Sequence, residues 1–233
     1  MTVDDPRVLE GMRTQLARRD DAVAGGDRPI GWKLGFGTAA SLQKFDLTQP
    51  LVGFLLDSGL LHDGAEVSFA GWTRPVLEPE VAVHVASDIE PGASYDTVRA
   101  AVAGLSAAIE LADLHPVPAR PGDVSDVLAG NIFHRHVLLG RPVTGRTGSG
   151  GLRATVTLDG AEVASTADAS ALTGDLVELV RQAVDQLAAV GARLRAGQVV
   201  ITGSVVPPVP VEAGQHVEVT VADLGRLSVS FRD

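Results

Sequence analysis

The chain has 233 residues, of which 45% are hydrophobic, and 19 Lys and Arg against 29 Asp and Glu give a formal net charge of −10. This acidic balance lacks the clustered positive charge that nucleic acids or anionic membranes require, so neither is an expected partner. The absence of cysteine excludes disulfides, thiolate metal sites and cysteine nucleophiles, so a metal would have to be held by oxygen or imidazole ligands.

The first 29 residues predict a short N-terminal helical segment. Residues 6 to about 23 carry apolar side chains at a spacing of three and four, with Pro6 near the helix start. The N-terminus has neither a positively charged start nor an apolar run, and no later stretch stays apolar for the ~18 residues of a membrane helix. We therefore expect a soluble, cytoplasmic protein with a main domain at 30–233.

The main domain reads as short strands separated by glycine and proline. They are expected at 30–34, 51–56, 76–85, 132–139, 152–158, 198–202, 216–221 and 226–231. Asp159-Gly160 is a two-residue hairpin signal, and residues 223–225 join the last two strands similarly, so the sheets are at least partly antiparallel. Residues 95–108 and 172–190 instead have helical spacing and are expected to pack on a sheet.

Glu78 and Glu80 form the most informative pattern in the chain. Side chains alternate along a strand, so these two carboxylates point to the same face, with Cβ atoms roughly 7 Å apart. Like charges in an otherwise apolar strand cost free energy unless a proton or cation neutralises them, which is the situation that a hard divalent ion exploits. The alternative is that both line the solvated face of an edge strand.

A third acid, Glu110, lies where the predicted apolar helix gives way to an apolar strand, with no nearby residue to pair with it. Three carboxylates with open positions for water would suit Mg²⁺ or Mn²⁺ and leave adjacent coordination sites for a chelating substrate.

Lys33 and two histidines are further candidates. Lys33 stands among apolar and small residues, where a desolvated lysine can serve as an acid or base; the alternative is a side chain that reaches solvent. His134 and His136 share one strand face and would suit a two-imidazole metal clamp, or else be ordinary partly buried histidines.

An ordered set of motifs runs from about Ile30 to Phe231. The motifs are Gly31-Trp32-Lys33-Leu34-Gly35, Gln49-Pro50 with Gly53-Phe54-Leu55-Leu56-Asp57, Pro75-Val76-Leu77-Glu78-Pro79-Glu80, Ala108-Ile109-Glu110, residues 126–140 with Asn131, and Val200-Ile201-Thr202-Gly203-Ser204. This ordered set resembles the 2-keto-4-pentenoate hydratase and 4-oxalocrotonate decarboxylase branch of the fumarylacetoacetate hydrolase superfamily.

The resemblance implies an α+β fold with a mixed β-roll or barrel-like core and a few packed helices. It also implies that Glu78, Glu80 and Glu110 are ligands of Mg²⁺ or Mn²⁺ and that Lys33 is the active-site lysine. Relatives use the metal to chelate a small 2-keto acid or its dienol and to stabilise an enolate.

Further site residues follow from the same motifs. We expect Lys33 to move a proton or hold the substrate carboxylate, and Asp57 to orient water if it faces the site. Asn131 is expected to bind substrate. Residues 202–204, through Thr202, Gly203 and Ser204, are expected to offer N–H and hydroxyl donors to the substrate carboxylate, or else to form a plain strand-ending turn.

Several positions depart from the family pattern. Leu51 stands where relatives often have an aspartate, Gly130 and Phe133 replace polar groups, and residues 166–175 lack the usual glycine-rich loop, so that Thr173 or Asp175 would cap the following helix. These changes fall around the substrate rather than the metal, so they bear on the reaction more than on the class.

The expected function is a metal-dependent lyase, most specifically one that hydrates a 2-hydroxypenta-2,4-dienoate in aromatic catabolism. Decarboxylation of a 4-oxalocrotonate-like diacid is the first alternative, with Arg74 or Arg135 as the cation for a second carboxylate. Hydrolysis of a carbon–carbon bond in an acylpyruvate and a non-catalytic metal-binding scaffold are the others. The family resemblance implies a homo-oligomer.

Overall fold

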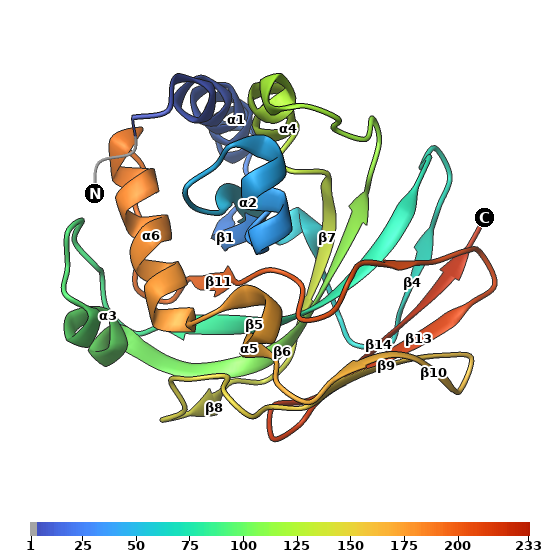
Figure 1. The fold of residues 1–233 in the computed structure, drawn as a ribbon. Helices are drawn as coiled ribbons and strands as arrows, with labels where there is room; N and C mark the ends of the chain where they lie inside the picture. The colour runs from blue at the N-terminus through green and yellow to red at the C-terminus, as the bar shows by residue number, and fades with distance from the viewer. Residues whose placement is uncertain (1–3) are drawn as a thin grey trace.

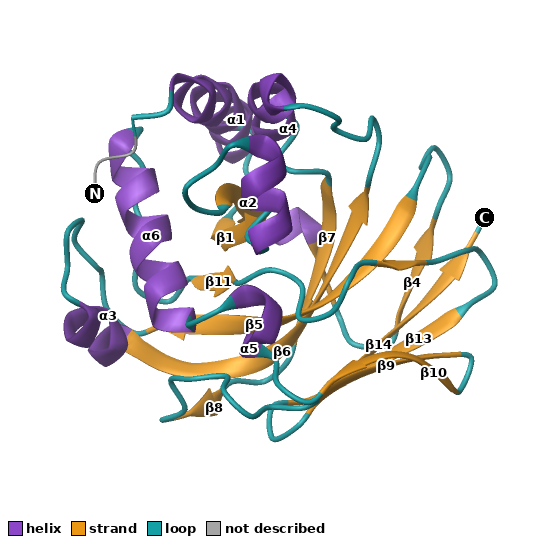
Figure 2. Ribbon diagram, in the orientation of Figure 1, coloured by secondary structure: helices purple, strands orange, loops and turns teal. Residues whose placement is uncertain are grey.

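The structure is a computed structural model that describes residues 4–233. Two mixed sheets and six α-helices make up the described part of the chain, which confirms the α+β expectation (Figures 1 and 2). No helix among the described residues is both long and apolar enough to span a membrane.

The larger sheet has nine strands and contains the candidate site. Its main path runs β2 (Leu51–Leu56), β1 (Pro29–Gly35), β11 (Val199–Ile201), β5 (Pro75–Val85), β6 (Val102–Asp113), β7 (His134–Leu139) and β3 (Leu60–Leu61). Two short strands join it from the sides, β12 (Val209–Pro210) on β5 and β8 (Val143–Thr144) on β6. The long β5 and β6 curve beneath the helices in Figure 1 and pair antiparallel along almost their whole length.

The smaller sheet lies at the right of Figure 2 and carries the hairpins predicted from the sequence. Its order is β10 (Ala161–Thr166), β9 (Ala154–Leu158), β13 (His216–Val221), β14 (Gly225–Arg232) and β4 (Ala65–Ser68). Asp159 and Gly160 have φ angles of 52° and 85°, which is the left-handed pair that a two-residue hairpin needs. Asp223 and Gly225 make the second turn, with φ angles of 63° and 110°.

The helices gather on one side of the curved sheet. They are α1 (Pro6–Ala24), α2 (Ala39–Phe45), α3 (Tyr95–Ala101), α4 (Val124–Ala129), α5 (Ser170–Thr173) and α6 (Leu176–Ala189). α1 begins as predicted, with Pro6 in its first turn and the Asp5 side chain accepting the Arg7 N–H. The helix α1 buries Val8, Met12 and Leu16 in the main core cluster.

Two predicted helices are wrong in their extent. The expected helix at 95–108 ends at Ala101, and residues 102–113 form β6, which is buried on both faces; its apolar residues therefore show no two-residue alternation and imitate helical spacing. The expected helix at 172–190 is divided at Gly174, whose φ is 88°, and α6 starts after Asp175, whose carboxylate accepts the Glu178 N–H. Of the two expected caps, Asp175 is the one that the structure shows.

Candidate metal and active site

The pairing of β5 with β6 brings the three glutamates together. Glu78 lies directly opposite Glu110 across the strand pair, and Glu80 follows two residues later on the same face. One carboxylate oxygen from each lies within 4.8 Å of the others. Glu80 and Glu110 are fully buried at 0% exposure, whereas Glu78 is partly buried. The spacing that suggested a shared face is therefore found on an inner strand, and the solvated edge strand is not what the structure shows.

Each of the two buried glutamates has one oxygen held by the protein and one without a partner among residues 4–233. The Gly203 N–H donates to Oε2 of Glu80 at 2.8 Å, and Oε1 of the same side chain has no hydrogen-bond partner. Oε1 of Glu110 accepts from both Lys33 and His134, and its Oε2 is likewise without a partner. Buried carboxylate oxygens without donors are costly, so these atoms call for a cation or protons.

The electrostatics of the cluster lead to the same requirement. Burial, followed by the charge of Glu110, raises the pKa of Glu78 from 4.5 to about 7. Burial and the charges of Glu110 and Glu78 raise the pKa of Glu80 well above its usual value. Burial also acts to raise the pKa of Glu110, but the Lys33 charge and the hydrogen bonds from His134 and Lys33 outweigh it and lower that pKa.

The donor set fits a hard divalent cation. Three carboxylates with free oxygens and a single ammonium group leave negative charge uncompensated, and oxygen ligands of this kind are those that Mg²⁺, Mn²⁺ and Ca²⁺ take in proteins. Glu78, Glu80 and Glu110 are the residues that would hold such an ion.

Lys33 is buried beside this cluster rather than extended to solvent. Its side chain is 2% exposed, and its ammonium group forms an ion pair with Glu110 and donates to the Ile132 carbonyl at 3.1 Å. Lys33 reaches this position because the paired residue on β2 is Gly53. A Cβ on Gly53 would lie 2.8 Å from Cγ of Lys33, so only glycine leaves room for the lysine.

A left-handed turn at residues 131–133 supports the lysine. Asn131, Ile132 and Phe133 have φ angles of 56°, 51° and 63°, so β7 begins at His134 rather than at the predicted residue 132. Positive φ is uncommon for such side chains and marks a position that the surrounding structure enforces. The Asn131 amide accepts the Phe54 N–H at 2.8 Å and donates to the Phe54 carbonyl at 3.0 Å, which ties the turn to β2.

The structure gives most of the expected substrate-binding groups a partner within the protein. The Thr202 hydroxyl donates to the Val81 carbonyl, and the Ser204 hydroxyl donates to the Val206 carbonyl at 2.6 Å. The Gly203 N–H holds Glu80, as described above. Gly203 thus holds a candidate metal ligand, whereas Thr202, Ser204 and Asn131 bond to backbone groups. Direct substrate contact by these residues stays a prediction.

Asp57 is not brought to the carboxylate cluster. It begins the 3₁₀ turn η1 (Asp57–Gly59) after β2, is 39% exposed and forms an ion pair of 2.7 Å with Arg28. Gly53, the neighbour of Lys33, lies inside β2, whereas Asp57 follows the end of that strand. Because a strand advances by about 3.3 Å per residue, Asp57 lies too far along the chain to reach the cluster.

The sequence connected His134 with a metal only through a two-imidazole clamp, with an ordinary partly buried histidine as the alternative. Its Nδ1 lies 2.8 Å from Oε1 of Glu110, whereas His136 stacks on Trp72 with ring centroids 6.0 Å apart. The two histidines therefore do not share a metal position.

The positions that depart from the family pattern include Leu51 and Phe133. Leu51 is buried at 1% exposure, and Phe133, the residue before His134, is partly buried against the main core.

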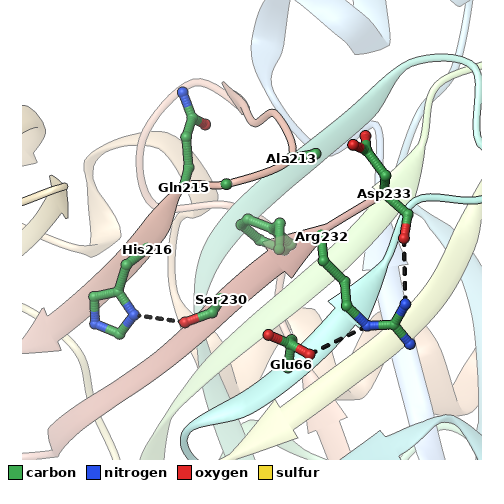
Figure 3. A pocket seen from close by; sticks show the side chains of 9 residues that line it. Glu66, Ala213, Gln215, His216, Ser230, Arg232 and Asp233 are labelled. Atoms are coloured by element: carbon green, nitrogen blue, oxygen red, sulfur yellow. Dashed lines mark hydrogen bonds and ion pairs between the residues drawn. The ribbon is translucent and has the colours of Figure 1, made fainter.

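A separate surface pocket lies on the smaller sheet, away from these residues (Figure 3). It has a volume of about 490 Å³ and is lined by side chains of β4, β13, β14 and the turn before β13. Its polar groups are paired with one another: His216 with Ser230 at 2.9 Å and Arg232 with Glu66 at 3.2 Å. Neither Lys33 nor the three clustered glutamates, Glu78, Glu80 and Glu110, line it.

Residues 35–232 match the family described as fumarylacetoacetate (FAA) hydrolase C-terminal. The chain belongs to the fumarylacetoacetate hydrolase family. The match begins at Gly35, the last residue of β1, and runs to the end of β14. It includes the three glutamates but not Lys33, and it confirms the resemblance inferred from the motifs.

Named relatives in this family are hydratases and decarboxylases. A 2-hydroxyhexa-2,4-dienoate hydratase of Comamonas testosteroni is 29% identical over 218 residues, covering 90% of this chain and 81% of that protein. A 2-keto-4-pentenoate hydratase of Paraburkholderia phymatum is 29% identical and covers 94% of this chain and 84% of its own. This member of the fumarylacetoacetate hydrolase family is therefore similar to hydratases over most of its length.

A solved structure shares most of this architecture. The 4-oxalocrotonate decarboxylase from Pseudomonas putida G7, complexed with magnesium and adipate, superposes with a TM-score of 0.85 at 26% identity, over 93% of this chain and 83% of that one. The same enzyme complexed with calcium and acetate gives a TM-score of 0.83. That relative binds divalent cations on the fold seen here.

Proposed function

We propose that the protein is a divalent-metal-dependent lyase that hydrates a 2-hydroxypenta-2,4-dienoate-type substrate to the corresponding 4-hydroxy-2-oxo acid. The observation that carries this proposal is the convergence of Glu78, Glu80 and Glu110 within 4.8 Å beside the buried Lys33. When bound there, Mg²⁺ or Mn²⁺ would supply a Lewis acid for the carboxylate and 2-oxo oxygens of such a substrate.

Lys33 would hold and move the proton of this reaction at Nζ. An ammonium group has three N–H donors, and two of them are used on Glu110 and Ile132. The third is left for a substrate oxygen or for proton transfer. Burial keeps water from competing for this donor, which strengthens its interaction with an anionic substrate.

The pairing of Arg135 within the protein favours a monocarboxylate over a diacid. Of the two arginines considered for a second carboxylate, Arg135 forms an ion pair of 3.1 Å with the buried Asp113 and stacks over Trp72. Its charge is therefore already balanced within the protein.

Decarboxylation of a 4-oxalocrotonate-like diacid is the second candidate. It is supported by the TM-score of 0.85 to a decarboxylase and by the exposed Arg74 at the start of β5. Asp57, paired with Arg28 in this structure, would contribute to either reaction only if that ion pair opens.

The two reactions are separated by a direct assay. Purified protein with Mg²⁺ or Mn²⁺ is given freshly generated 2-hydroxypenta-2,4-dienoate, and loss of the dienol absorbance is followed together with identification of the 4-hydroxy-2-oxo product by NMR. Release of CO₂ from 4-oxalocrotonate with no hydration of the dienoate would replace hydration by decarboxylation. No turnover of either substrate, or of an acylpyruvate, despite tight metal binding would identify a non-catalytic scaffold and contradict the proposal.

The proposal also covers the localisation, the oligomeric state, the metabolic role and the domain boundaries. We infer a cytoplasmic homo-oligomer acting in aromatic catabolism, with residues 1–29 as an N-terminal segment added to the catalytic domain at 30–233. Chromatography with light scattering measures the subunit number, and inductively coupled plasma mass spectrometry of protein purified without added metal identifies the ion that it carries.

A further inference from the structure

The imidazole of His134 makes a single polar contact, and that contact is to a predicted metal ligand. Its Nδ1 lies 2.8 Å from Oε1 of Glu110, and its Nε2 is buried without a hydrogen-bond partner among the described residues. The side chain is only 7% exposed. A histidine that is buried only for packing would be expected to have hydrogen bonds on both ring nitrogens. We therefore attribute the burial of His134 to its contact with Glu110.

The contact restricts which oxygen of Glu110 is left for a cation. A carboxylate oxygen can only accept, so Nδ1 must carry the proton whatever the state of Nε2. Lys33 and His134 both donate to Oε1, which fixes the plane of the carboxylate and leaves Oε2 as its free oxygen.

The left-handed turn at residues 131–133 positions both groups that donate to Glu110, although Lys33 itself comes from β1. The Ile132 carbonyl accepts from Lys33, and two residues later the His134 ring reaches the same glutamate. The His134 N–H bonds the Asn131 carbonyl, and the Phe133 carbonyl accepts the Asp113 N–H on β6, so the turn is held at both ends. The strained backbone thus has a use, which is to aim the imidazole at Glu110.

We propose that His134 is a positioning residue of the metal centre, which orients Glu110 through Nδ1–H so that one oxygen of Glu110 faces Glu78 and Glu80. This inference rests on the metal site of the proposed function and adds a residue to it. Outer hydrogen-bond partners of this kind orient metal ligands and raise metal affinity.

The test is the affinity of the metal-free protein for Mn²⁺, measured by electron paramagnetic resonance of the free ion. His134→Phe removes the donor and keeps a ring, and we expect it to weaken Mn²⁺ binding by about 10- to 100-fold. His134→Asn keeps an N–H donor near the position of Nδ1, and we expect it to recover most of the affinity. His136→Phe, the same change two residues along β7, is the matched control and should bind Mn²⁺ as the wild type does.

The outcomes separate this inference from the proposed function. Equal Mn²⁺ affinity of His134→Phe and the wild type would overturn the positioning role while leaving the metal site intact. Failure of the wild type to bind Mn²⁺ would overturn both. If His134→Phe does not fold, as judged by thermal unfolding, ¹⁵N-histidine NMR of the wild type replaces it: a protonated Nδ1 whose resonance shifts on adding Mg²⁺ supports the role, and an unprotonated Nδ1 overturns it.

Discussion

Glu78 is the residue on which a metal-dependent reaction depends most directly. Replacing it with glutamine keeps the size of the side chain but removes one negative charge from the cluster. We expect Glu78→Gln to lower turnover at least 100-fold, because removal of a metal ligand costs several kcal/mol of transition-state stabilisation. Two quantities are measured: kcat at saturating Mn²⁺ and the affinity of the variant for Mn²⁺.

The same variant should not harm the fold. The metal-free protein holds Glu78 beside two other carboxylates, so a neutral side chain relieves repulsion there. At pH 8 the metal-free Glu78→Gln protein should therefore unfold at the same or a higher temperature than the metal-free wild type. Glu218→Gln on the exposed side of the smaller sheet is a control that should leave activity unchanged. Full activity in Glu78→Gln would disprove the assigned ligand set.

Acidity should oppose metal binding over a defined range. The pKa of Glu78 is raised from 4.5 to about 7 and that of Glu80 is also raised, so the fold favours their protonated forms. In the metal-free protein this contribution to stability is fully present below pH 4.5 and is lost as the pH rises toward 7. The pKa of Glu110 is lowered, so its contribution to stability has the opposite pH dependence: it is lost as the pH falls below the usual range of glutamate pKa values.

Thermal unfolding with and without Mn²⁺ measures this effect. The unfolding temperature of the metal-free protein should fall between pH 5 and 7, and the increase produced by Mn²⁺ should grow over about the same interval, because cations and protons compete for the same oxygens. An increase that is independent of pH would show that these carboxylates are not the ligands.

At the scale of elements, Lys33 on β1 fits against β2 because the residue paired with it, Gly53, has no side chain. A methyl group on Gly53 would meet Cγ of Lys33 at 2.8 Å and Oδ1 of Asn131 at 2.7 Å, so one of them must move. We expect Gly53→Ala to lower kcat by about 10- to 100-fold, since an error near 1 Å in a catalytic group has effects of that size. Mn²⁺ affinity should change less than kcat. Gly122→Ala is the control, because Gly122 has no positive φ and no described atom lies within 4 Å of the position of its Cβ. Unchanged kcat in Gly53→Ala would refute the role of this close packing.

The elements also show how far the sequence could lead. The two-residue period placed Glu78 and Glu80 on one face, because that pattern is local. The position of Glu110 opposite Glu78 depends on the register of β5 and β6, which joins residues far apart in the chain and leaves no local signal. Only the family resemblance linked the three.

The turn at residues 131–133 could not be predicted from its residues. Ile132 and Phe133 disfavour positive φ, so the sequence reads as the start of a strand. The tertiary contacts to Phe54 and Lys33 hold the left-handed conformation instead. The contact between His134 and Glu110 depends on this turn. Because the turn was not predicted, the sequence suggested instead that His134 and His136 share a metal position.

At the scale of the whole molecule, α1 supports the site from a distance. Met12 is fully buried in the core, and Gln15 donates to the Leu128 carbonyl on α4, the helix that precedes the turn at 131–133. Met12→Ala should lower the free energy of unfolding by about 2 to 5 kcal/mol, as for other large-to-small core changes. Urea denaturation measures it. Exposed Arg13→Ala is the matched control, and equal stability of the two variants would show that α1 is an independent segment rather than part of the core.

The most direct test of the central claim is a crystal structure of the protein with Mn²⁺ and oxalate, using the anomalous signal of manganese. We predict one strong anomalous peak bonded to oxygens of Glu78, Glu80 and Glu110, with oxalate completing the coordination beside Lys33. A manganese peak elsewhere, or none at saturating Mn²⁺, would contradict the account.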